Sequence, residues 1–279
     1  MKSSVDLHLH TTASDGRMNP ADLIRKLINN GLSLVAITDH DSTEGIAAAQ
    51  QEANNQEGFE LIHGVELGAD VPDGEIHMLG YFLNVDDENF QKNLQRFRDG
   101  RALRGLRMVE KLNEIGMEIE WERVQEYAQG GAITRPHIAL ALLEKGYVLS
   151  FEEAFEKFIG RDGLAYVGRE KLTPEQAIEL IHENGGLSVL AHPARYVNNL
   201  EEILPKLKQA GLIGMEAHYK DYTVGEIDYL LSLCQTYDLI PCGGSDYHAL
   251  GTSDEVEPGL VGPPMESVER LKERVKSTR

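Results

Sequence analysis

Histidine, aspartate and glutamate recur in this chain at the places where apolar runs end. They stand in five short segments: His8-Leu9-His10 with Asp15, Thr38-Asp39-His40-Asp41, Gly64-Val65-Glu66 with His77, Ala191-His192-Pro193, and Ser245-Asp246-Tyr247-His248. Imidazoles and carboxylates are costly to bury one at a time, but a cluster of them is what divalent metal ions bind. A fold that brought these segments together would therefore build one metal centre.

The spacing within the first segment sets the direction of its side chains. His8 and His10 are two residues apart in an alternating run, so both rings point to the same face of a strand. That face could be the polar outside of an edge strand, but Leu7 and Leu9 alone would then be buried, so the interior of a barrel is favoured. Asp15 stands in a Ser-Asp-Gly turn, and its position after the two histidines favours a ligand over a plain turn residue.

The other segments offer one or two ligands each. We expect His40 to bind metal and Asp39 to orient it. Glu66 follows an apolar run, and its carboxylate could bridge two ions. Asp246 and His248 are again two residues apart, after a Gly-Gly pair that permits close backbone approach. The mixed set suits Mn²⁺, Fe²⁺ or Zn²⁺ better than Mg²⁺ alone.

The elements that must position these residues follow a repeated strand–helix pattern. Apolar or alternating runs predict strands over residues 5–10, 32–38, 59–67, 76–83, 187–191, 213–217 and 239–242. Capping signals such as Asn19-Pro20 predict helices between most of them. At this length the pattern favours a parallel α/β barrel of about seven units, with the ligands at its carboxyl-terminal mouth. Since His192 precedes Pro193, its backbone should be extended.

One stretch breaks the pattern. Residues 86–164 contain no strong strand, and they predict one long helix followed by shorter ones. The predicted organisation is a barrel formed by 1–85 and 165–279, with 86–164 as a helical insertion that caps it. On the long helix Arg98, Arg101, Arg104 and Arg107 recur every third residue, and a solvated face paired with acids is the favoured interpretation. One or two of them could still reach a substrate.

Composition excludes several function classes. The 279 residues carry a formal net charge of −19, which argues against charge-driven binding to duplex nucleic acid or to anionic lipid. An enzyme acting on phosphates would then need local positive charge from metals or arginines. Cys234 and Cys242 suggest neither a disulfide framework nor a zinc ribbon. We see no signal peptide and no membrane span, so the expected location is cytoplasmic, and the oligomeric state stays open.

The five segments resemble the motifs of the PHP (polymerase and histidinol phosphatase) family of metal-dependent phosphoesterases. The resemblance extends over nearly the whole chain and includes the run Thr12-Ala13-Ser14-Asp15-Gly16 after the two histidines. It implies a distorted (βα)7 TIM-like barrel with two to three divalent ions, Mn²⁺ foremost and Fe²⁺ or Zn²⁺ as alternatives. By the same resemblance, the metal ligands are His8, His10, Asp15, His40, Glu66, His77, His192, Asp246 and His248. Asp15, Glu66, His192 and His248 would also take part in catalysis.

The helical insertion narrows the resemblance to one subgroup of the family. Gly130 to His137 and Glu152 to Val167 resemble the cap of the TrpH/YciV-like subgroup. Its members remove the 3′-phosphate from nucleoside 3′,5′-bisphosphates or trim 5′-monophosphorylated RNA from the 5′ end. The leading expectation is the bisphosphate reaction, with hydroxide generated by clustered metals. The alternatives are a 5′→3′ exoribonuclease for short RNA, a histidinol-phosphate-type metabolite phosphatase and a PHP-like binding module without chemistry.

A substrate with two phosphates needs a second anion site. Arg135 opens a helix of the insertion and Arg195 lies three residues past His192, and guanidinium groups bind phosphate in a bidentate way. We therefore expect both arginines to contact substrate. His137 could also do so, and His218 is either a pocket wall or a bystander. The expected partner is a nucleotide or the 5′ end of a short RNA.

Overall fold

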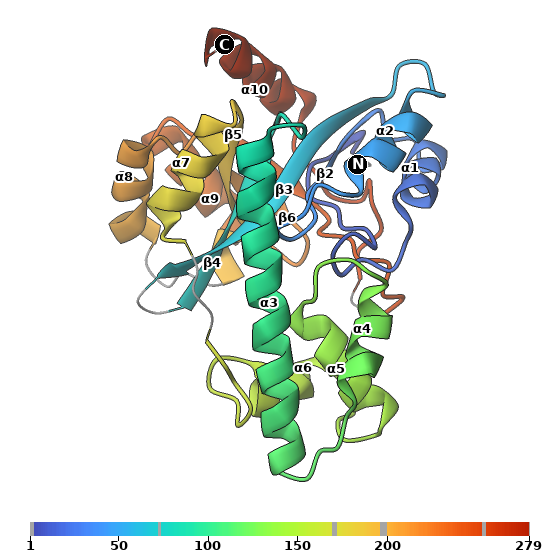
Figure 1. The fold of residues 1–279 in the computed structure, drawn as a ribbon. Coiled ribbons are helices and arrows are strands. Elements are labelled where there is room, and N and C mark those ends of the chain that lie inside the picture. Colours follow the sequence, from blue (N-terminus) through green and yellow to red (C-terminus); the bar gives the residue numbers. More distant parts are fainter. Residues whose placement is uncertain (1–2, 72–73, 169–171, 196–199, 253–254, 279) are drawn as a thin grey trace.

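The strands of the barrel are short runs of mostly buried residues. The computed structural model describes residues 3–71, 74–168, 172–195, 200–252 and 255–278, and it contains one seven-stranded sheet in the order β1-β2-β3-β4-β5-β6-β7 (Figure 1). The strands are β1 Val5–Asp6, β2 Leu34–Ile37, β3 Glu60–Val71, β4 Gly74–Tyr81, β5 Leu187–Ala191, β6 Gly214–Tyr219 and β7 Ile240–Gly244. Leu9 forms a parallel bridge with Tyr247 just beyond β1 and β7, so the sheet nearly closes into the predicted α/β barrel.

The fourth strand runs opposite to its neighbours. β4 is antiparallel to both β3 and β5, whereas the other neighbouring strands pair in parallel. β3 ends at Val71 and β4 begins at Gly74, which leaves no room for the helical crossover that parallel strands need. The expectation of a parallel barrel therefore holds for the other strands but was wrong for β4. The reversal places His77 opposite Gly68 and Ala191, at the end of the barrel where β5 finishes.

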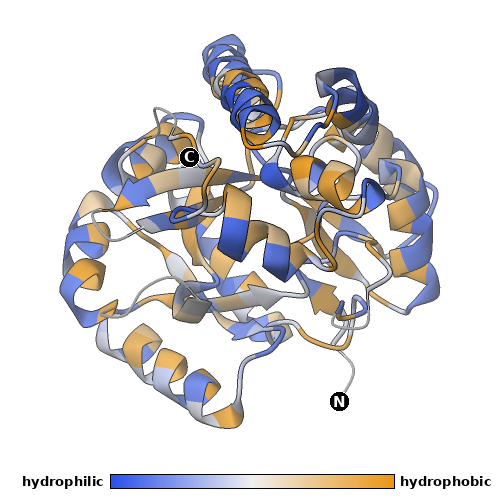
Figure 2. Ribbon diagram, turned by 90° about the horizontal axis from the view of Figure 1, so that it is seen from below, coloured by the Kyte–Doolittle hydropathy of each residue, from blue (hydrophilic) through white to orange (hydrophobic). Residues whose placement is uncertain are grey.

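Helices cover the outside of the sheet. They are α1 Pro20–Asn29, α2 Ile46–Ala53, α7 Pro174–Glu183, α8 Leu200–Ala210 and α9 Val224–Thr236. Hydrophobic and hydrophilic residues alternate along them, as expected of helices with one side against a sheet (Figure 2). The predicted start of α1 is confirmed, because the Asn19 side chain accepts a hydrogen bond from the Ala21 amide. No helix in the described part of the chain has both the length and the apolar content to cross a bilayer.

The helical insertion forms a separate lobe next to the barrel (Figure 1). It contains α3 Glu88–Glu114, α4 Trp121–Ala128, α5 Arg135–Glu144, α6 Phe151–Ala154 and the π-helical turn Phe155–Ile159. The long helix α3 belongs to both lobes. Phe90 and Leu94 pack into the core beside the sheet, whereas Met108 and Leu112 pack into the core of the insertion. Residues 86–164, all of which the structure describes, contain no strand, as predicted.

The barrel interior is apolar at its amino-terminal end. Strand residues such as Leu79, Val189 and Cys242 form one cluster with Val268 and Leu271 of α10 (Met265–Thr278), which covers this end. Buried polar side chains gather toward the carboxyl-terminal ends of the strands instead. The fold therefore leaves one end of the barrel for chemistry.

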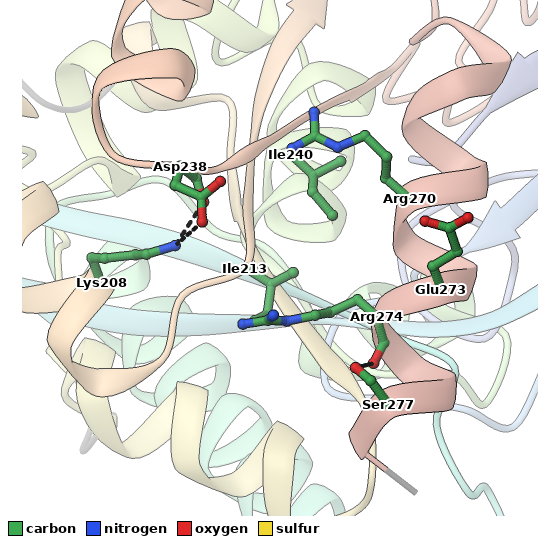
Figure 3. Close-up of a pocket in the computed structure, with 8 residues that line it drawn as sticks. All are labelled: Lys208, Ile213, Asp238, Ile240, Arg270, Glu273, Arg274 and Ser277. Carbon is green, nitrogen blue, oxygen red and sulfur yellow. Dashed lines mark hydrogen bonds and ion pairs between the residues drawn. The ribbon is translucent and has the colours of Figure 1, made fainter.

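A shallow pocket of about 280 Å³ lies between α8 and α10 at the closed end. Ile240, the first residue of β7, forms part of its wall, and Arg270 and Arg274 project from α10 (Figure 3). Lys208 of α8 donates to the Asp238 backbone carbonyl at 2.6 Å. The described residues that line this pocket include no histidine, so the predicted metal ligands lie elsewhere.

Candidate metal centre

Two histidines enter the barrel mouth from the segment after β1. The rings of His8 and His10 are fully buried, and their Nε2 atoms lie 3.1 Å apart. Both rings thus point into one space, as the two-residue spacing predicted. The neighbouring backbone can approach because β7 ends in glycine: a Cβ at Gly244 would lie 2.5 Å from the His8 amide nitrogen.

The loop after His10 carries Asp15 over the same space. Asp39 holds this loop, because its carboxylate accepts hydrogen bonds from the Thr11 amide at 2.7 Å and from the Ser14 hydroxyl at 2.6 Å. We expected Asp39 to orient His40, but these bonds show that it orders the loop that carries Asp15. Burial raises the pKa of Asp39, and the bonds to the loop stabilise its charged form.

Glu66 lies at the centre of the cluster. Its carboxylate oxygens contact ring nitrogens of His8 at 3.3 Å, His10 at 3.2 Å, His40 at 3.3 Å, His77 at 2.6 Å and His192 at 3.0 Å. Its side chain is only 1% exposed. Because both oxygens are surrounded by imidazoles from different strands, this carboxylate is placed where it could bridge two cations.

The segment after β7 completes the mouth. Asp246 Oδ1 lies 3.3 Å from His8 Nε2 and 3.1 Å from His10 Nε2, and its Oδ2 accepts a 2.6 Å hydrogen bond from the Tyr219 hydroxyl. The His248 ring stacks on His10 with 4.1 Å between ring centroids. Asp246 has a φ of +50°, a strained value for a residue other than glycine. Strain of this kind is held in place by the contacts around it.

His192 follows β5 in an unusual backbone conformation. Its φ is +29°, so the expectation of an extended backbone before Pro193 was wrong. The His192 amide donates to Glu216 Oε2 at 2.8 Å, and this bond helps to hold the turn. The turn directs the ring so that its Nε2 lies 3.0 Å from Glu66 Oε1. A positive φ of this kind costs roughly 1–3 kcal/mol, which the surrounding contacts must offset.

The predicted ligands fall into overlapping groups. Among the residues that the structure describes, three sets have ligand atoms within 4.8 Å of one another: His10, Asp15, His40 and His248; His8, His10 and Glu66; and His40, Glu66 and His77. His10, His40 and Glu66 each belong to two sets, so the sets form one continuous centre. His192 borders it through Glu66, and Asp246 borders it through His8 and His10.

The charges of this centre depend on one another. Burial opposes a charged His10, but Asp246 and Glu66 outweigh it and raise its pKa to about 10. The pKa of His77 is raised to about 9, again against burial, by Glu66. Burial also opposes a charged Glu66, but His40 and His77 hold its pKa well below the usual range. The carboxylates therefore stabilise positive charge at His10 and His77, whereas burial lowers the pKa of His40 to about 3 and keeps its ring neutral, as a metal-binding imidazole must be.

Two buried nitrogen atoms support a metal at this place. Nδ1 of His10 and Nδ1 of His40 are buried and make no hydrogen bond with the described residues, although they face the carboxylates of Asp15 at 3.7 Å and of Glu66 at 3.3 Å. Buried polar atoms nearly always have partners, so such atoms need an explanation. A set of imidazoles and carboxylates with unused nitrogen donors fits Mn²⁺, Fe²⁺ or Zn²⁺.

A cavity of about 160 Å³ opens from the cluster toward the helical insertion. Its barrel side includes Glu66, His77, His192 and other predicted ligands. Its insertion side consists of Arg101, Arg104, Thr134, Arg135, Pro136 and Phe155. The insertion therefore supplies positive charge and a short apolar wall opposite the candidate metal centre.

Two arginines of α3 face this cavity. Arg101 and Arg104 are only 5% and 4% exposed, so a solvated face was the wrong expectation for them. Residues three apart share one side of a helix, and that side of α3 lies over the barrel mouth. Arg101 Nε donates to Asp41, while its Nη2 has no hydrogen-bond partner among the described residues. Arg107 is exposed, as expected.

Arg135, a predicted substrate contact, also lines the cavity. Its Nη2 lies 3.3 Å from Glu75 Oε2, and its guanidinium carbon lies 5.3 Å from the centre of the Phe155 ring. Glu75 lies two residues before His77 on β4, and its Oε1 is 3.5 Å from His77 Nε2. Glu75 therefore joins Arg135 to the barrel, a link that sequence reasoning overlooked.

Two other predicted substrate contacts, His137 and His218, do not line the cavity. His137 caps α5, since its Nδ1 accepts a 3.1 Å hydrogen bond from the Thr134 amide, and burial lowers its pKa to about 4. His218 is half-buried on β6, and neither histidine is among the described residues that line the cavity. Arg195 ends a short 3₁₀ turn, but its side chain lies outside the described residues.

Comparison with known proteins gives evidence on the family of this chain that does not depend on the geometry of the site. The PHP domain family model matches residues 6–238. The 5′-3′ exoribonuclease Rnm of Salmonella typhimurium is 34% identical over 247 residues, which cover 87% of this chain and 84% of that protein. A 3′,5′-nucleoside bisphosphate phosphatase of Chromobacterium violaceum is 27% identical over 253 residues, which cover 89% of this chain and 88% of that protein.

Two solved structures share this fold over nearly the whole chain. A Bifidobacterium adolescentis protein described as a metal-dependent phosphoesterase has a TM-score of 0.87 at 29% identity, covering 97% of this chain and 96% of that one. An amidohydrolase from Chromobacterium violaceum with bound sulfate has a TM-score of 0.87 at 27% identity, covering 96% of this chain and 97% of that one. The fold, the motifs and these matches agree: the chain belongs to the PHP domain family of metal-dependent phosphoesterases and is a phosphoric ester hydrolase.

Proposed function

We propose that this protein removes the 3′-phosphate from nucleoside 3′,5′-bisphosphates, with adenosine 3′,5′-bisphosphate as the leading substrate. One observation carries the proposal: a single cavity is lined by the candidate metal centre on one side and by Arg101, Arg104 and Arg135 on the other. A substrate with two phosphates matches this arrangement, with the scissile phosphate at the metal centre and the second at the arginines.

The nine predicted ligands would hold the ions, with Mn²⁺ as the leading metal. When bound, such ions lower the pKa of a coordinated water and stabilise charge on the phosphoryl oxygens. Asp15, Glu66, His192 and His248 are the ligands that we assign to catalysis, as the family resemblance implies, and all four line the cavity, as do His40, His77 and Asp246.

The remaining residues would hold the substrate. Arg101 is fixed by Asp41, and its Nη2 can donate to a second phosphate without breaking that ion pair. Arg135 is similarly held by Glu75. Pro136 and Phe155 offer an apolar wall for the ribose or base. Because the guanidiniums are held before substrate arrives, less conformational entropy is lost on binding.

Trimming of short 5′-monophosphorylated RNA is the second candidate. The 5′ nucleotide of such an RNA has the same two groups as a nucleoside 3′,5′-bisphosphate: a 5′-phosphate and a 3′-phosphoryl ester. Relatives at 33–34% identity that are named 5′-3′ exoribonucleases favour this activity. The net charge of −19 disfavours tight binding of long RNA, so the substrates would be short.

A substrate panel tests the proposal. We expect adenosine 3′,5′-bisphosphate to have a higher kcat/KM than adenosine 3′-monophosphate by about tenfold or more, since a charge-assisted contact is lost with the 5′-phosphate. A 5′-phosphorylated trinucleotide tests the second candidate. Equal kcat/KM for the two adenosine phosphates, or a preference for histidinol phosphate, would overturn the proposal. Arg135→Ala should weaken bisphosphate turnover while metal content stays intact.

A further inference from the structure

Glu216 is a fully buried carboxylate beside the candidate metal centre that the proposed reaction does not use. It lies on β6, and its side chain is 0% exposed. Both oxygens lie 3.1 Å from His8 Nδ1, and Oε2 also accepts the His192 amide at 2.8 Å. Among the described residues, its ion pair within 4.0 Å is with His8. Burying a carboxylate is costly unless it is paired, and both of these contacts are with predicted metal ligands.

The His8 ring has a different neighbour on each side. Nδ1 faces Glu216, while Nε2 faces the cluster, at 3.3 Å from both Glu66 and Asp246. A neutral imidazole has one N–H and one lone pair. A carboxylate at Nδ1 can only accept, so it keeps the proton on that nitrogen and leaves the Nε2 lone pair for a metal.

The same carboxylate also reaches a second predicted ligand through the backbone. His192 has a strained φ of +29°, and its amide is bound by Glu216. Its ring contacts Glu66 on the other side of the cluster. One side chain therefore orients ligands from the ends of two different strands, β1 and β5.

Geometry excludes a direct ligand role shared with His8. The imidazole ring stands between Glu216 and the cluster, so the carboxylate cannot reach an ion bound by His8 Nε2. Glu216 also belongs to none of the ligand groups formed by the described residues.

We infer that Glu216 is a positioning residue that fixes the Nδ1–H tautomer of His8 and the turn at His192. It thereby sets the metal affinity of the centre. The inference rests on the proposal that His8 and His192 bind metal. A carboxylate behind a metal-binding histidine typically changes metal affinity by about 10–100-fold.

Glu216→Gln is the test variant, because the amide keeps the shape but places an N–H donor next to two other donors. Asp6→Asn is the matched control. Asp6 is equally buried, and its Oδ1 accepts from the backbone amides of His8 and Ser245 rather than from a ring. Zn²⁺ affinity is measured by chelator competition, and long-range ¹H–¹⁵N correlations of Zn²⁺-loaded protein identify the protonated nitrogen of His8. A His8→Gln variant assigns that signal.

We expect Glu216→Gln to bind Zn²⁺ about 10–100-fold more weakly than wild type, with occupancy restored by excess Zn²⁺, and Asp6→Asn to keep wild-type affinity. In Zn²⁺-loaded wild type, His8 should be protonated at Nδ1. Equal affinities for Glu216→Gln and wild type, or an equal loss in Asp6→Asn, would overturn the inference. A His8 ring protonated at Nε2 in the wild-type protein would also overturn the inference. This measurement on the wild type remains decisive even if Glu216→Gln fails to fold. A wild-type protein that binds no metal would instead overturn the metal centre itself.

Discussion

Arg101 of α3 donates through Nε to the carboxylate of Asp41, and this buried ion pair fastens the helical insertion to the barrel mouth. Asp41 directly follows the predicted ligand His40 and has a φ of +50°. Arg98, one turn earlier on α3, donates to the Asp41 carbonyl at 3.1 Å. The guanidinium of Arg101 also lines the cavity. One side chain therefore joins the insertion, the cavity and the segment that carries a predicted metal ligand.

Replacement of Arg101 should separate its two roles. Arg101→Ala removes one partner of a buried ion pair with Asp41, so it should destabilise the fold by about 3–5 kcal/mol. Arg101→Lys keeps a charge near Asp41 but loses the unused Nη2 donor. It should therefore raise the KM for adenosine 3′,5′-bisphosphate, while the free energy of unfolding changes less than in Arg101→Ala. Urea denaturation and steady-state kinetics measure the two effects. Arg107→Lys, exposed on the same helix, is the control, and a wild-type KM for Arg101→Lys would refute the phosphate role.

Glu66→Gln should lose bound metal while the fold persists. The amide is neutral and offers an N–H group to imidazoles that now face a carboxylate oxygen. We expect a large drop in metal per chain by elemental analysis and a matching loss of phosphate release. His63→Gln is the control on the same strand, because His63 contacts Gln50 outside the cluster. Full metal content in Glu66→Gln would argue against a central ligand.

Metal binding should release protons. The pKa values of His10 and His77 are raised above 6.5, to about 10 and about 9, so both rings are charged at neutral pH in the metal-free protein. A metal must displace those protons, so metal affinity should rise with pH up to that range and fall as pH is lowered. Calorimetry in two buffers with different ionisation enthalpies counts the protons released at pH 7. A count of zero would show that these histidines are not ligands.

Helix α5 of the insertion should loosen in acid more than helix α1 of the barrel does. Burial lowers the pKa of His137 from 6.5 to about 4, and its neutral Nδ1 caps α5. A depressed pKa means that stability is fully present above the unfolded value of 6.5 and is lost as pH falls toward 4. Hydrogen exchange, corrected for intrinsic rates, should therefore accelerate in α5 over this range more than in α1, which Asn19 caps without a titratable group. An equal acceleration of hydrogen exchange in α5 and α1 would contradict a pH-sensitive cap.

Much of the site could be predicted because local sequence determines it. The ligand segments place ionisable groups directly after apolar runs, and the Gly-Gly pair before Asp246 signals the close approach found at Gly244. His77 was expected in the cluster, but the reversal of β4 that brings it to the barrel mouth was not predicted. That reversal is a matter of pairing between strands rather than of local pattern.

The residues that surround the metal centre were harder to predict. A three-residue spacing of arginines is the same for a solvated face and for a buried one, and only the packing of α3 over the mouth decides between them. Glu216 carried one weak signal, an acid within a run of apolar residues, where burial requires a partner. Its partners come from β1 and β5, which the sequence of β6 alone does not reveal.

The most direct test of a metal centre that hydrolyses phosphoesters is a metal titration under turnover. Protein stripped with a chelator is titrated with Mn²⁺, and phosphate release from adenosine 3′,5′-bisphosphate is followed. We predict no release without metal, a rise in proportion to bound Mn²⁺ and a plateau at about two to three ions per chain. Full hydrolysis by the stripped protein, or a rate that does not follow bound metal, would contradict the metal-dependent site.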